Sequence, residues 1–243
     1  MHELPLSGPE IDNDALIALY NSQDQQLVRM NFVSSIDGAV TVDGRSEGLG
    51  GSADKAVFGI LRMLADGIMV GAGTLRDEQY RAVRPTAERR AWRVAAGLKP
   101  YPCLIVVSGA LRLDPSNRAL ADAPVRPIIL THGASDVERR DALSSVADVL
   151  VHGVDRVDLV AAVAELRERY GLYKILCEGG PHLFGALHAA NLVDEVCLTL
   201  SPLVAGPNAG RIIAGAAGSA VTRMRLVQAL AADSTLILRY ARA

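Results

Sequence analysis

The chain has 243 residues, of which 50% are apolar and 21% are charged, and its formal net charge is −2. This composition is typical of a globular protein and excludes a disordered chain, a collagen and a disulfide-rich scaffold. Because positive and negative charges nearly balance and no block of like charges occurs, we expect no binding to nucleic acid or to a membrane through net charge.

The sequence shows no pattern of a metal site or a targeting segment. The three cysteines, Cys103, Cys177 and Cys197, lie far apart in apolar runs and lack the spacing of zinc ligands. We therefore expect buried thiols, no bound metal and a reduced, cytoplasmic protein. Residues 1–12 lack the apolar core of a signal peptide. The apolar runs fall far short of the ~20 residues that a membrane helix needs.

Apolar runs of strand length alternate along the chain with segments whose apolar residues recur at helical spacing. The segment 54–64 has such a helical pattern, and Ser52 before it is a candidate N-cap. In chain order, we expect strands at 27–34, 67–70, 103–107, 127–130, 147–151 and 173–177, helices at 54–64, 159–170 and 181–190, and β-rich segments at 193–200 and 235–241.

Strands that are separated by helices form a parallel sheet covered on both faces. We therefore predict a three-layer α/β/α domain with a mixed, mostly parallel sheet. The two β-rich segments near the C-terminus are predicted to form antiparallel strands at one edge. Residues 1–26 are an N-terminal extension in this interpretation, and residues 27–243 form one domain in which 205–220 is a loop.

Open parallel sheets bind ligands at the carboxyl ends of their strands, and one such end is Glu178-Gly179-Gly180-Pro181, directly before an apolar helix. Two glycines allow a ligand to approach the backbone, and proline suits the first helical position. The free N–H groups of this helix are therefore a candidate anion site. A simple turn is the plainer interpretation of two glycines. The Glu178 carboxylate favours a functional one, because a turn does not need it.

Three other strand ends carry candidate residues. The GAGT segment at 71–74 is interpreted as a shortened glycine turn, which is a weak motif alone. Together with the first glycine pair, it suits the pyrophosphate of a dinucleotide. Asp37 follows the first strand and Ser108 follows another, although both residues also fit ordinary β-turns.

Basic residues cluster at Arg62, Arg76, Arg81 and Arg84, with Tyr80 among them. Guanidinium groups bind phosphate through paired hydrogen bonds, so this cluster suits a phosphorylated small substrate. The plainer interpretation is a solvated helix face.

These motifs together resemble the reductase domain of riboflavin biosynthesis. SIDG at 35–38, GAGT at 71–74 and EGGPHLFGAL at 178–187 follow one another in its order and spacing, and NLVDE at 191–195 and SPLV at 201–204 complete the pattern. The resemblance covers residues 27–240. It implies the dihydrofolate reductase fold and reduction of 5-amino-6-(5-phosphoribosylamino)uracil with NADPH, in which the ribose becomes a ribityl chain. It also implies a homodimer through C-terminal strands and a cis peptide between Gly179 and Gly180.

The resemblance also implies roles for individual residues. Substrate contacts fall on Glu47, Arg62, Arg81, Arg84 and Glu178. NADPH contacts fall on Val33, Leu49, Thr74, Asp77, Ser108, Gly180, Pro181, His182, Leu183, Phe184, Gly185 and Ala186. From the strand ends and the basic cluster we add Gly71, Gly73 and Gly179 to the cofactor set and Tyr80 to the substrate set. We assign the catalytic role to Glu178 and Asp37.

The chain departs from the family pattern at one segment. Many members carry Ser-x-Trp-Ile-Thr where this chain has EGLGG at 47–51. Reduction of a related pterin such as dihydrofolate therefore stays an alternative, and a non-enzymatic NADPH-binding protein is another. The spacing after Thr74 leaves either Asp77 or Glu78 as the cofactor contact. Neither motif of the zinc deaminase domain that bifunctional members carry is present.

Overall fold

The computed structural model describes residues 10–207, 209–215 and 221–243. Its centre is a nine-stranded sheet with the order β5-β4-β3-β2-β6-β1-β7-β9-β8. The strands are β1 (Leu27–Ser35), β2 (Gly67–Gly71), β3 (Cys103–Val107), β4 (Ile128–Thr131), β5 (Asp148–Val151), β6 (Lys174–Cys177), β7 (Glu195–Ser201), β8 (Met224–Ala232) and β9 (Thr235–Arg242). The helices are α1 (Asn13–Tyr20), α2 (Ser52–Leu64), α3 (Ala72–Asp77), α4 (Ala87–Ala95), α5 (Arg118–Ala121), α6 (Val137–Leu143), α7 (Leu159–Tyr170) and α8 (Pro181–Ala189).

The sheet is mixed and mostly parallel, which confirms the predicted fold class. All neighbouring strands from β5 to β7 are parallel. β9 pairs antiparallel with β7 and with β8, and Leu198 of β7 faces Leu238 of β9 in this register. The parallel part needs helical crossovers, whereas the last two strands need only a hairpin turn.

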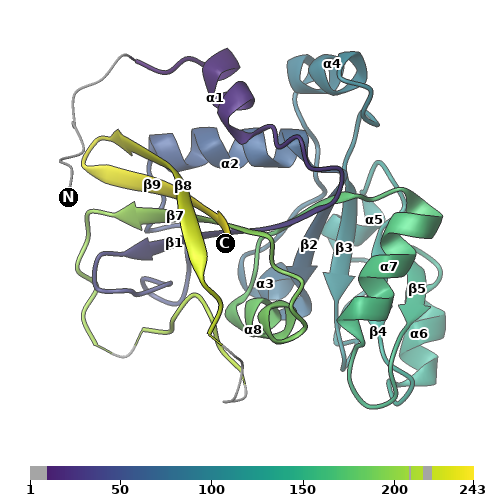
Figure 1. The fold of residues 1–243 in the computed structure, drawn as a ribbon. Helices are drawn as coiled ribbons and strands as arrows, with labels where there is room; N and C mark the ends of the chain where they lie inside the picture. Colours follow the sequence, from purple (N-terminus) through teal and green to yellow (C-terminus); the bar gives the residue numbers. More distant parts are fainter. Residues whose placement is uncertain (1–9, 208, 216–220) are drawn as a thin grey trace.

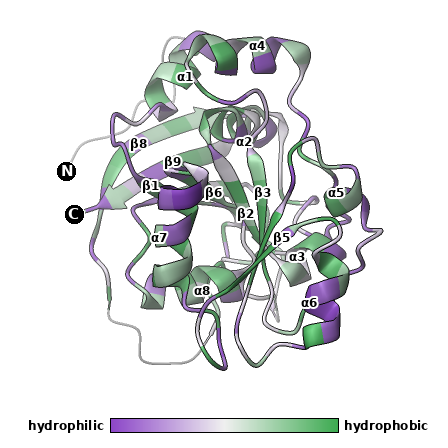
Figure 2. Ribbon diagram, turned by 90° about the vertical axis from the view of Figure 1, so that its right-hand side faces the viewer, coloured by the Kyte–Doolittle hydropathy of each residue, from purple (hydrophilic) through white to green (hydrophobic). Residues whose placement is uncertain are grey.

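Helices cover both faces of the sheet, and each face has its own apolar core. On one face, α7 and α8 pack on the strands through residues such as Met30 and Leu166. On the other face, α3, α5 and α6 pack through Leu75 and Leu120, and α1 and α2 pack farther along the sheet around Tyr20. The central strands are accordingly hydrophobic in Figure 2, whereas α6 and α7 carry hydrophilic residues. The molecule has three layers, as predicted.

Two local expectations at helix starts are wrong. Ser52 is the first residue of α2 rather than its cap; the N-cap is Gly51, whose carbonyl accepts the Lys55 N–H. Residues 73 and 74 lie on α3 rather than in a glycine turn, because α3 begins at Ala72. A six-residue helix is too short to show a helical period in the sequence. Pro181 occupies the first turn of α8 as predicted.

The C-terminal edge also differs from the prediction. The 193–200 and 235–241 segments do pair, but neither lies at the edge, because β7 is between β1 and β9 and β8 covers the other side of β9. The edge strand β8 was not predicted, since its sequence MRLVQALAA is rich in alanine, which strands disfavour. Asp233 and Ser234 join β8 to β9 with positive φ at both positions, the geometry of a tight hairpin turn.

The predicted N-terminal extension and the predicted 205–220 loop are only partly described by the structure. Residues 1–9 of the expected extension and residues 208 and 216–220 of the expected loop lie outside the described part. Within the extension, α1 packs on α2 and buries Tyr20 fully. Among the described residues, the helices are too short or too polar to span a membrane.

Candidate active site

A cavity of about 300 Å³ lies beside β1, between the first turns of α2, α3 and α8. Phe32, Val33 and Phe58 contribute apolar surface to it, and Asp54 and Thr74 are among its polar groups. The other lining residues are Asn31, Val40, Thr41, Ser46, Glu47, Gly50, Lys55, Glu78, Gly180 and Pro181. Apolar walls with a few convergent polar groups are typical of small-molecule sites.

Two neighbouring strands, β2 and β6, end beside this cavity, and a helix starts after each. The Gly71 N–H donates to the Gly179 carbonyl over 2.8 Å, so the starts of α3 and α8 lie side by side (Figure 1). A Cβ on Gly180 would lie 2.9 Å from Thr74 Oγ1, and a Cβ on Gly179 would lie 3.0 Å from the Phe32 ring. Gly179 also has a φ of +90°. Side chains are therefore excluded here, and the Gly179–Gly180 peptide is cis, as the resemblance implies.

The start of α8 is suited to an anion. Its N-cap, Gly180, makes no side-chain capping hydrogen bond, so the first N–H groups of the helix are open to a ligand. These groups and the helix dipole favour negative charge at this point. The place where Gly71 and Gly179 meet, called the glycine crossing here, is therefore suited to the pyrophosphate of a dinucleotide. The adjoining cavity has room for one of the rings of such a ligand.

Arg62, whose guanidinium lies against the cavity residue Phe58, forms a buried ion pair with Glu178. The Glu178 carboxylate, 5% exposed, accepts hydrogen bonds from Arg62 Nε and Nη2, each over 2.7 Å, and from the Tyr80 hydroxyl over 2.6 Å. Arg62 also donates to the Tyr80 oxygen, and its guanidinium lies 4.2 Å from the centre of the Phe58 ring. Residues from α2, from the segment after α3 and from the end of β6 are thus joined in one network.

The charges of this network hold one another in place. Burial and the neighbouring Glu178 carboxylate raise the pKa of Tyr80 well above its usual value, so the phenol stays protonated and donates its hydrogen bond. Burial, the largest single effect, disfavours the Arg62 charge, but Glu178 and Tyr80 together outweigh it and raise the pKa of the guanidinium.

A comparison with protein families decides where this arrangement belongs. The model of the RibD C-terminal domain matches residues 26–238. The chain belongs to the RibD C-terminal domain family. The resemblance to the reductase domain of riboflavin biosynthesis is thereby confirmed.

Individual relatives agree with this assignment. The 2,5-diamino-6-ribosylamino-4(3H)-pyrimidinone 5′-phosphate reductase of Archaeoglobus fulgidus is 31% identical over 180 residues, which cover 74% of this chain and 81% of the relative. A pyrimidine reductase-like protein of Corynebacterium diphtheriae matches with a TM-score of 0.84 at 27% identity, over 94% of this chain and 98% of that chain. Dihydrofolate reductase of Enterococcus faecalis, with a TM-score of 0.51 at 10% identity over 90% and 97% of the two chains, shares the fold.

The RibD-type residues assigned to the cofactor are only partly brought together. Val33, Thr74, Gly180 and Pro181 line the cavity, and Leu49 is buried next to its lining residue Gly50. Four more assigned residues are close by in the chain: Gly71 and Gly179 meet at the crossing, and Gly73 and Asp77 lie on α3. Along α8, His182 and Ala186 are exposed, while Leu183 and Phe184 are buried in the core. The Phe184 ring stacks there on Phe32 with centroids 5.4 Å apart.

Gly185 has a packing reason to be glycine. A Cβ there would come within 1.9 Å of the Ala214 carbonyl oxygen, so the 212–214 segment runs directly over α8. The Ala214 N–H donates to the Pro181 carbonyl over 3.0 Å. Close contact between two backbones accounts for this glycine without a ligand.

Ser108 lies apart from the cavity, at the end of β3. Its Oγ accepts the Leu111 N–H over 3.0 Å, which shapes the turn that follows the strand. Beyond that turn is a hollow of about 430 Å³ that Arg76, Arg112 and Arg139 line from three different segments. Three guanidinium groups and one carboxylate, that of Asp114, line this hollow, so its charge is net positive and attracts anions.

The remaining substrate assignments are spread out. Glu47 lines the cavity, whereas Arg81 is exposed on the segment after α3. Arg84 is also exposed and donates to the Asp122 carbonyl near α5. The structure therefore joins Arg62, Tyr80 and Glu178 but does not gather Arg81 and Arg84 beside them.

Asp37 is outside the cavity and holds two chain segments together. Its carboxylate accepts hydrogen bonds from the Ser35 hydroxyl and from the backbone N–H groups of Ala205 and Gly206. These bonds, that of Ser35 first, lower its pKa to about 2. The two backbone bonds tie the turn after β1 to the segment after β7, so these contacts favour a structural role for this carboxylate.

Several cavity residues were missed by the sequence analysis. Asp54 and Phe58 lie one helical turn apart on α2, and Lys55 follows Asp54. Glu78, which the sequence analysis gave as the alternative to Asp77, also lines the cavity, whereas Asp77 does not. The helical pattern of 54–64 was interpreted only for its apolar face. An acid and an aromatic residue at i and i+4 on the same helix were the signal that was available.

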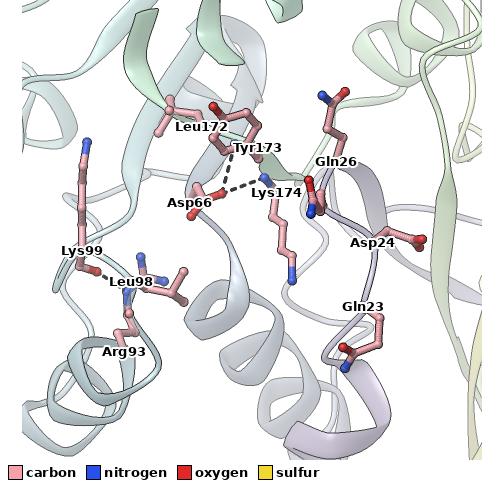
Figure 3. Close-up of a pocket in the computed structure, with 13 residues that line it drawn as sticks. Gln23, Asp24, Gln26, Asp66, Arg93, Leu98, Lys99, Leu172, Tyr173 and Lys174 are labelled. Carbon is pink, nitrogen blue, oxygen red and sulfur yellow. Dashed lines mark hydrogen bonds between the residues drawn. The ribbon is translucent and has the colours of Figure 1, made fainter. Parts of the chain in front are cut away.

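A second large hollow, of about 510 Å³, lies at the amino ends of β1, β2 and β6 (Figure 3). Asp66 there accepts the N–H groups of Tyr173 and Lys174, and the Lys174 ammonium donates to the Ser22 carbonyl. Arg93 donates to carbonyls at the end of α2 and to Lys99. These polar groups connect chain turns, and none of the predicted site residues lines the hollow. In the described residues, no group of His, Cys, Asp and Glu is arranged to hold a metal ion.

Proposed function

We propose that this protein is a nicotinamide-dependent reductase of a phosphoribosylaminopyrimidine in riboflavin biosynthesis. The observation that carries the proposal is the crossing of Gly71 and Gly179 at the open start of α8, directly beside a cavity lined by aromatic and polar groups. The name of the Archaeoglobus fulgidus relative supports a pyrimidine substrate that carries a ribose 5′-phosphate.

The residues of the chain have binding and orienting roles in this reaction. The α8 N-terminus would hold the pyrophosphate of the cofactor, and Val33 and Thr74 would border its nicotinamide ring in the cavity. The bound cofactor supplies a hydride. Phe32 and Phe58 form apolar walls that exclude water, and polar groups of the wall such as Glu47 orient the pyrimidine.

The preference for NADPH over NADH belongs to the same proposal. The arginine-lined hollow next to Ser108 is suited to a ribose 2′-phosphate, and a charge-assisted contact to phosphate contributes ~1.5–3 kcal/mol. We expect at least tenfold tighter binding of NADPH. Arg112→Ala is expected to remove most of this preference, without weakening NADH, while Arg118→Ala on α5 is not. Equal dissociation constants for the two cofactors in the unmodified protein would refute the preference.

The reaction is tested by following the absorbance of the reduced nicotinamide. Purified protein is mixed with NADPH and either the 2-amino or the 2-oxo form of the phosphoribosylaminopyrimidine, with dihydrofolate in a parallel assay. Oxidation with a pyrimidine supports the proposal, and the faster form identifies the substrate. Oxidation with dihydrofolate alone would favour the pterin alternative. Binding of NADPH without oxidation by any of the three would favour a non-enzymatic binding protein.

A homodimer is part of the proposal as well. Leu198, Leu200, Leu236, Leu238 and Tyr240 lie on one face of β7 and β9, and directly paired residues share a face. Leu236 is 37% exposed and Leu226 of the edge strand is 44% exposed. An apolar face that ends in a free edge strand is suited to isologous pairing with a second copy. The three free thiols support a reducing, cytoplasmic location.

A further inference from the structure

The binding and orienting roles proposed above do not include a proton donor for the reaction. Reduction of the ribosyl carbon opens a ring, and the released oxygen needs a proton. The Glu178 carboxylate is fully engaged by Arg62 and Tyr80, and Asp37 is outside the cavity. Neither predicted catalytic residue is therefore placed to supply that proton.

Asp54 is placed inside the cavity. It lies in the first turn of α2, and its carboxylate is so close to the preceding segment that a Cβ on Gly50 would come within 2.7 Å of Oδ2. The Thr199 hydroxyl is near enough to lower the pKa of this carboxyl. Thr199 is 2% exposed on β7 and pairs directly with Val33 on β1. The carboxyl is thus held next to the strand position that borders the nicotinamide space.

The surroundings of Asp54 favour its protonated form. Burial raises the pKa of the carboxyl, and the Thr199 hydroxyl and the Lys55 charge only partly oppose this effect. Two other acids, Glu47 and Glu78, also line the cavity. Glu78 accepts the Ser46 N–H over 3.0 Å, so it is anchored to the loop. A general acid must be positioned and able to hold its proton before the step; Asp54 is positioned in the cavity, and its raised pKa favours the protonated form.

We propose that Asp54 is the proton donor to the ring oxygen of the ribosyl group, an inference that rests on the proposed function. The bond between C1′ and the ring oxygen breaks, and its electron pair goes to the oxygen. The oxygen takes the proton from the Asp54 carboxyl. C1′ gains the hydride, so the sugar carbon is reduced and the nicotinamide is oxidised. Water returns a proton to Asp54 after the step.

The test compares Asp54→Asn with Asp14→Asn, the matched first-turn aspartate of α1, which is exposed. We expect Asp54→Asn to lower kcat by about 100-fold or more, the usual contribution of a general acid. The dissociation constant of NADPH is expected to change less than twofold, and Asp14→Asn to behave as the unmodified protein. The kcat of the unmodified protein is expected to fall as the pH rises above the carboxyl pKa. Asp54→Asn loses this dependence, and Asp54→Glu partly restores the rate.

A measurement on the ligand-free protein separates this inference from the proposed function. Carbon-13 NMR of labelled aspartate carboxyls identifies Asp54 as the signal that Asp54→Asn lacks, and its titration midpoint is expected above the ordinary aspartate value. A midpoint at or below that value overturns the inference whatever the substrate. Turnover by Asp54→Asn within threefold of the unmodified protein overturns it while leaving the reductase intact. Lack of turnover by the unmodified protein refutes the proposed function instead, and the titration then decides the inference.

Discussion

Glu178, which the sequence analysis predicted as a catalytic residue, forms a buried ion pair with Arg62 in the structure. Its side chain is 5% exposed, and the positive charge of Arg62 compensates its charge. Removing one member of a buried pair leaves the other charge without a partner, which costs ~3–5 kcal/mol. Arg62→Ala is therefore expected to lower the free energy of unfolding by about 3 kcal/mol in urea titrations.

The control for this substitution is Arg118→Ala, which breaks an exposed i,i+4 pair with Asp122. Exposed helical pairs contribute ~0.3–0.5 kcal/mol, so this variant is expected to unfold at nearly the same urea concentration as the unmodified protein. Equal losses in the two variants would show that Glu178 is solvated despite its low exposure.

The Asp54 carboxyl also has a consequence for stability at the residue scale. Burial raises its folded-state pKa above the ordinary aspartate value. The stabilisation from its protonated form is fully present below the unfolded-state pKa and is lost as the pH rises through the folded-state pKa. Asp54→Asn is thus expected to have a higher Tm than the unmodified protein at pH 7, with the difference shrinking as the pH is lowered. A lower Tm at pH 7 would contradict this sign.

At the scale of elements, the start of α8 depends on a missing side chain. The backbone of Gly180 has an extended φ of −81°, which any residue adopts, but a Cβ there would displace the Thr74 hydroxyl. Gly180→Val is expected to weaken NADPH binding at least tenfold, because the side chain occupies the space of the pyrophosphate. Isothermal titration calorimetry measures this loss.

Gly51→Ala is the matched control. Gly51 is the N-cap of α2 with a similar extended backbone, and a Cβ there meets nothing within 4 Å. We expect Gly51→Ala to bind NADPH normally. Unchanged affinity in Gly180→Val would show that the glycine pair forms a turn and nothing more.

The elements that sequence reasoning found are those with enough residues to show a period. The twelve residues of α7 and the alternation in β7 were predictable, whereas the four-residue α5 and the alanine-rich β8 were not. The site divides in the same way. The glycines at 179 and 180 are a local signal, but the contact between Tyr80 and Glu178 joins residues 98 positions apart. The acid that lines the cavity is Asp54 rather than Asp37. This outcome depends on how α2 packs and could not be predicted from the spacing of neighbouring residues.

At the scale of the whole molecule, the sheet has two different edges. β5 ends the parallel side, and β8 ends the antiparallel side with Leu226 and Leu236 nearby on an apolar face. We expect the protein to sediment at about twice its 25.7 kDa mass. Leu226→Asp combined with Leu236→Asp is expected to shift it to the monomer, because a charge cannot be buried in that interface.

Val151→Asp on the other edge strand, β5, is the control for this pair, since Val151 is 42% exposed. It is expected to leave the oligomer unchanged. A mass near 25.7 kDa for the unmodified protein at micromolar concentration would refute the dimer, and dissociation by Val151→Asp would place the interface at the wrong edge.

The three cysteines lie on three different strands, β3, β6 and β7, and all are buried. Burial raises the pKa of each thiol to about 12, so the reactive thiolate is scarce and no reagent reaches it in the closed sheet. The rate at which each thiol reacts with an added reagent therefore measures how often its own strand opens. The rate at which Cys197 reacts reports how often the C-terminal hairpin separates from the sheet, and Cys103 reports the same for the parallel side.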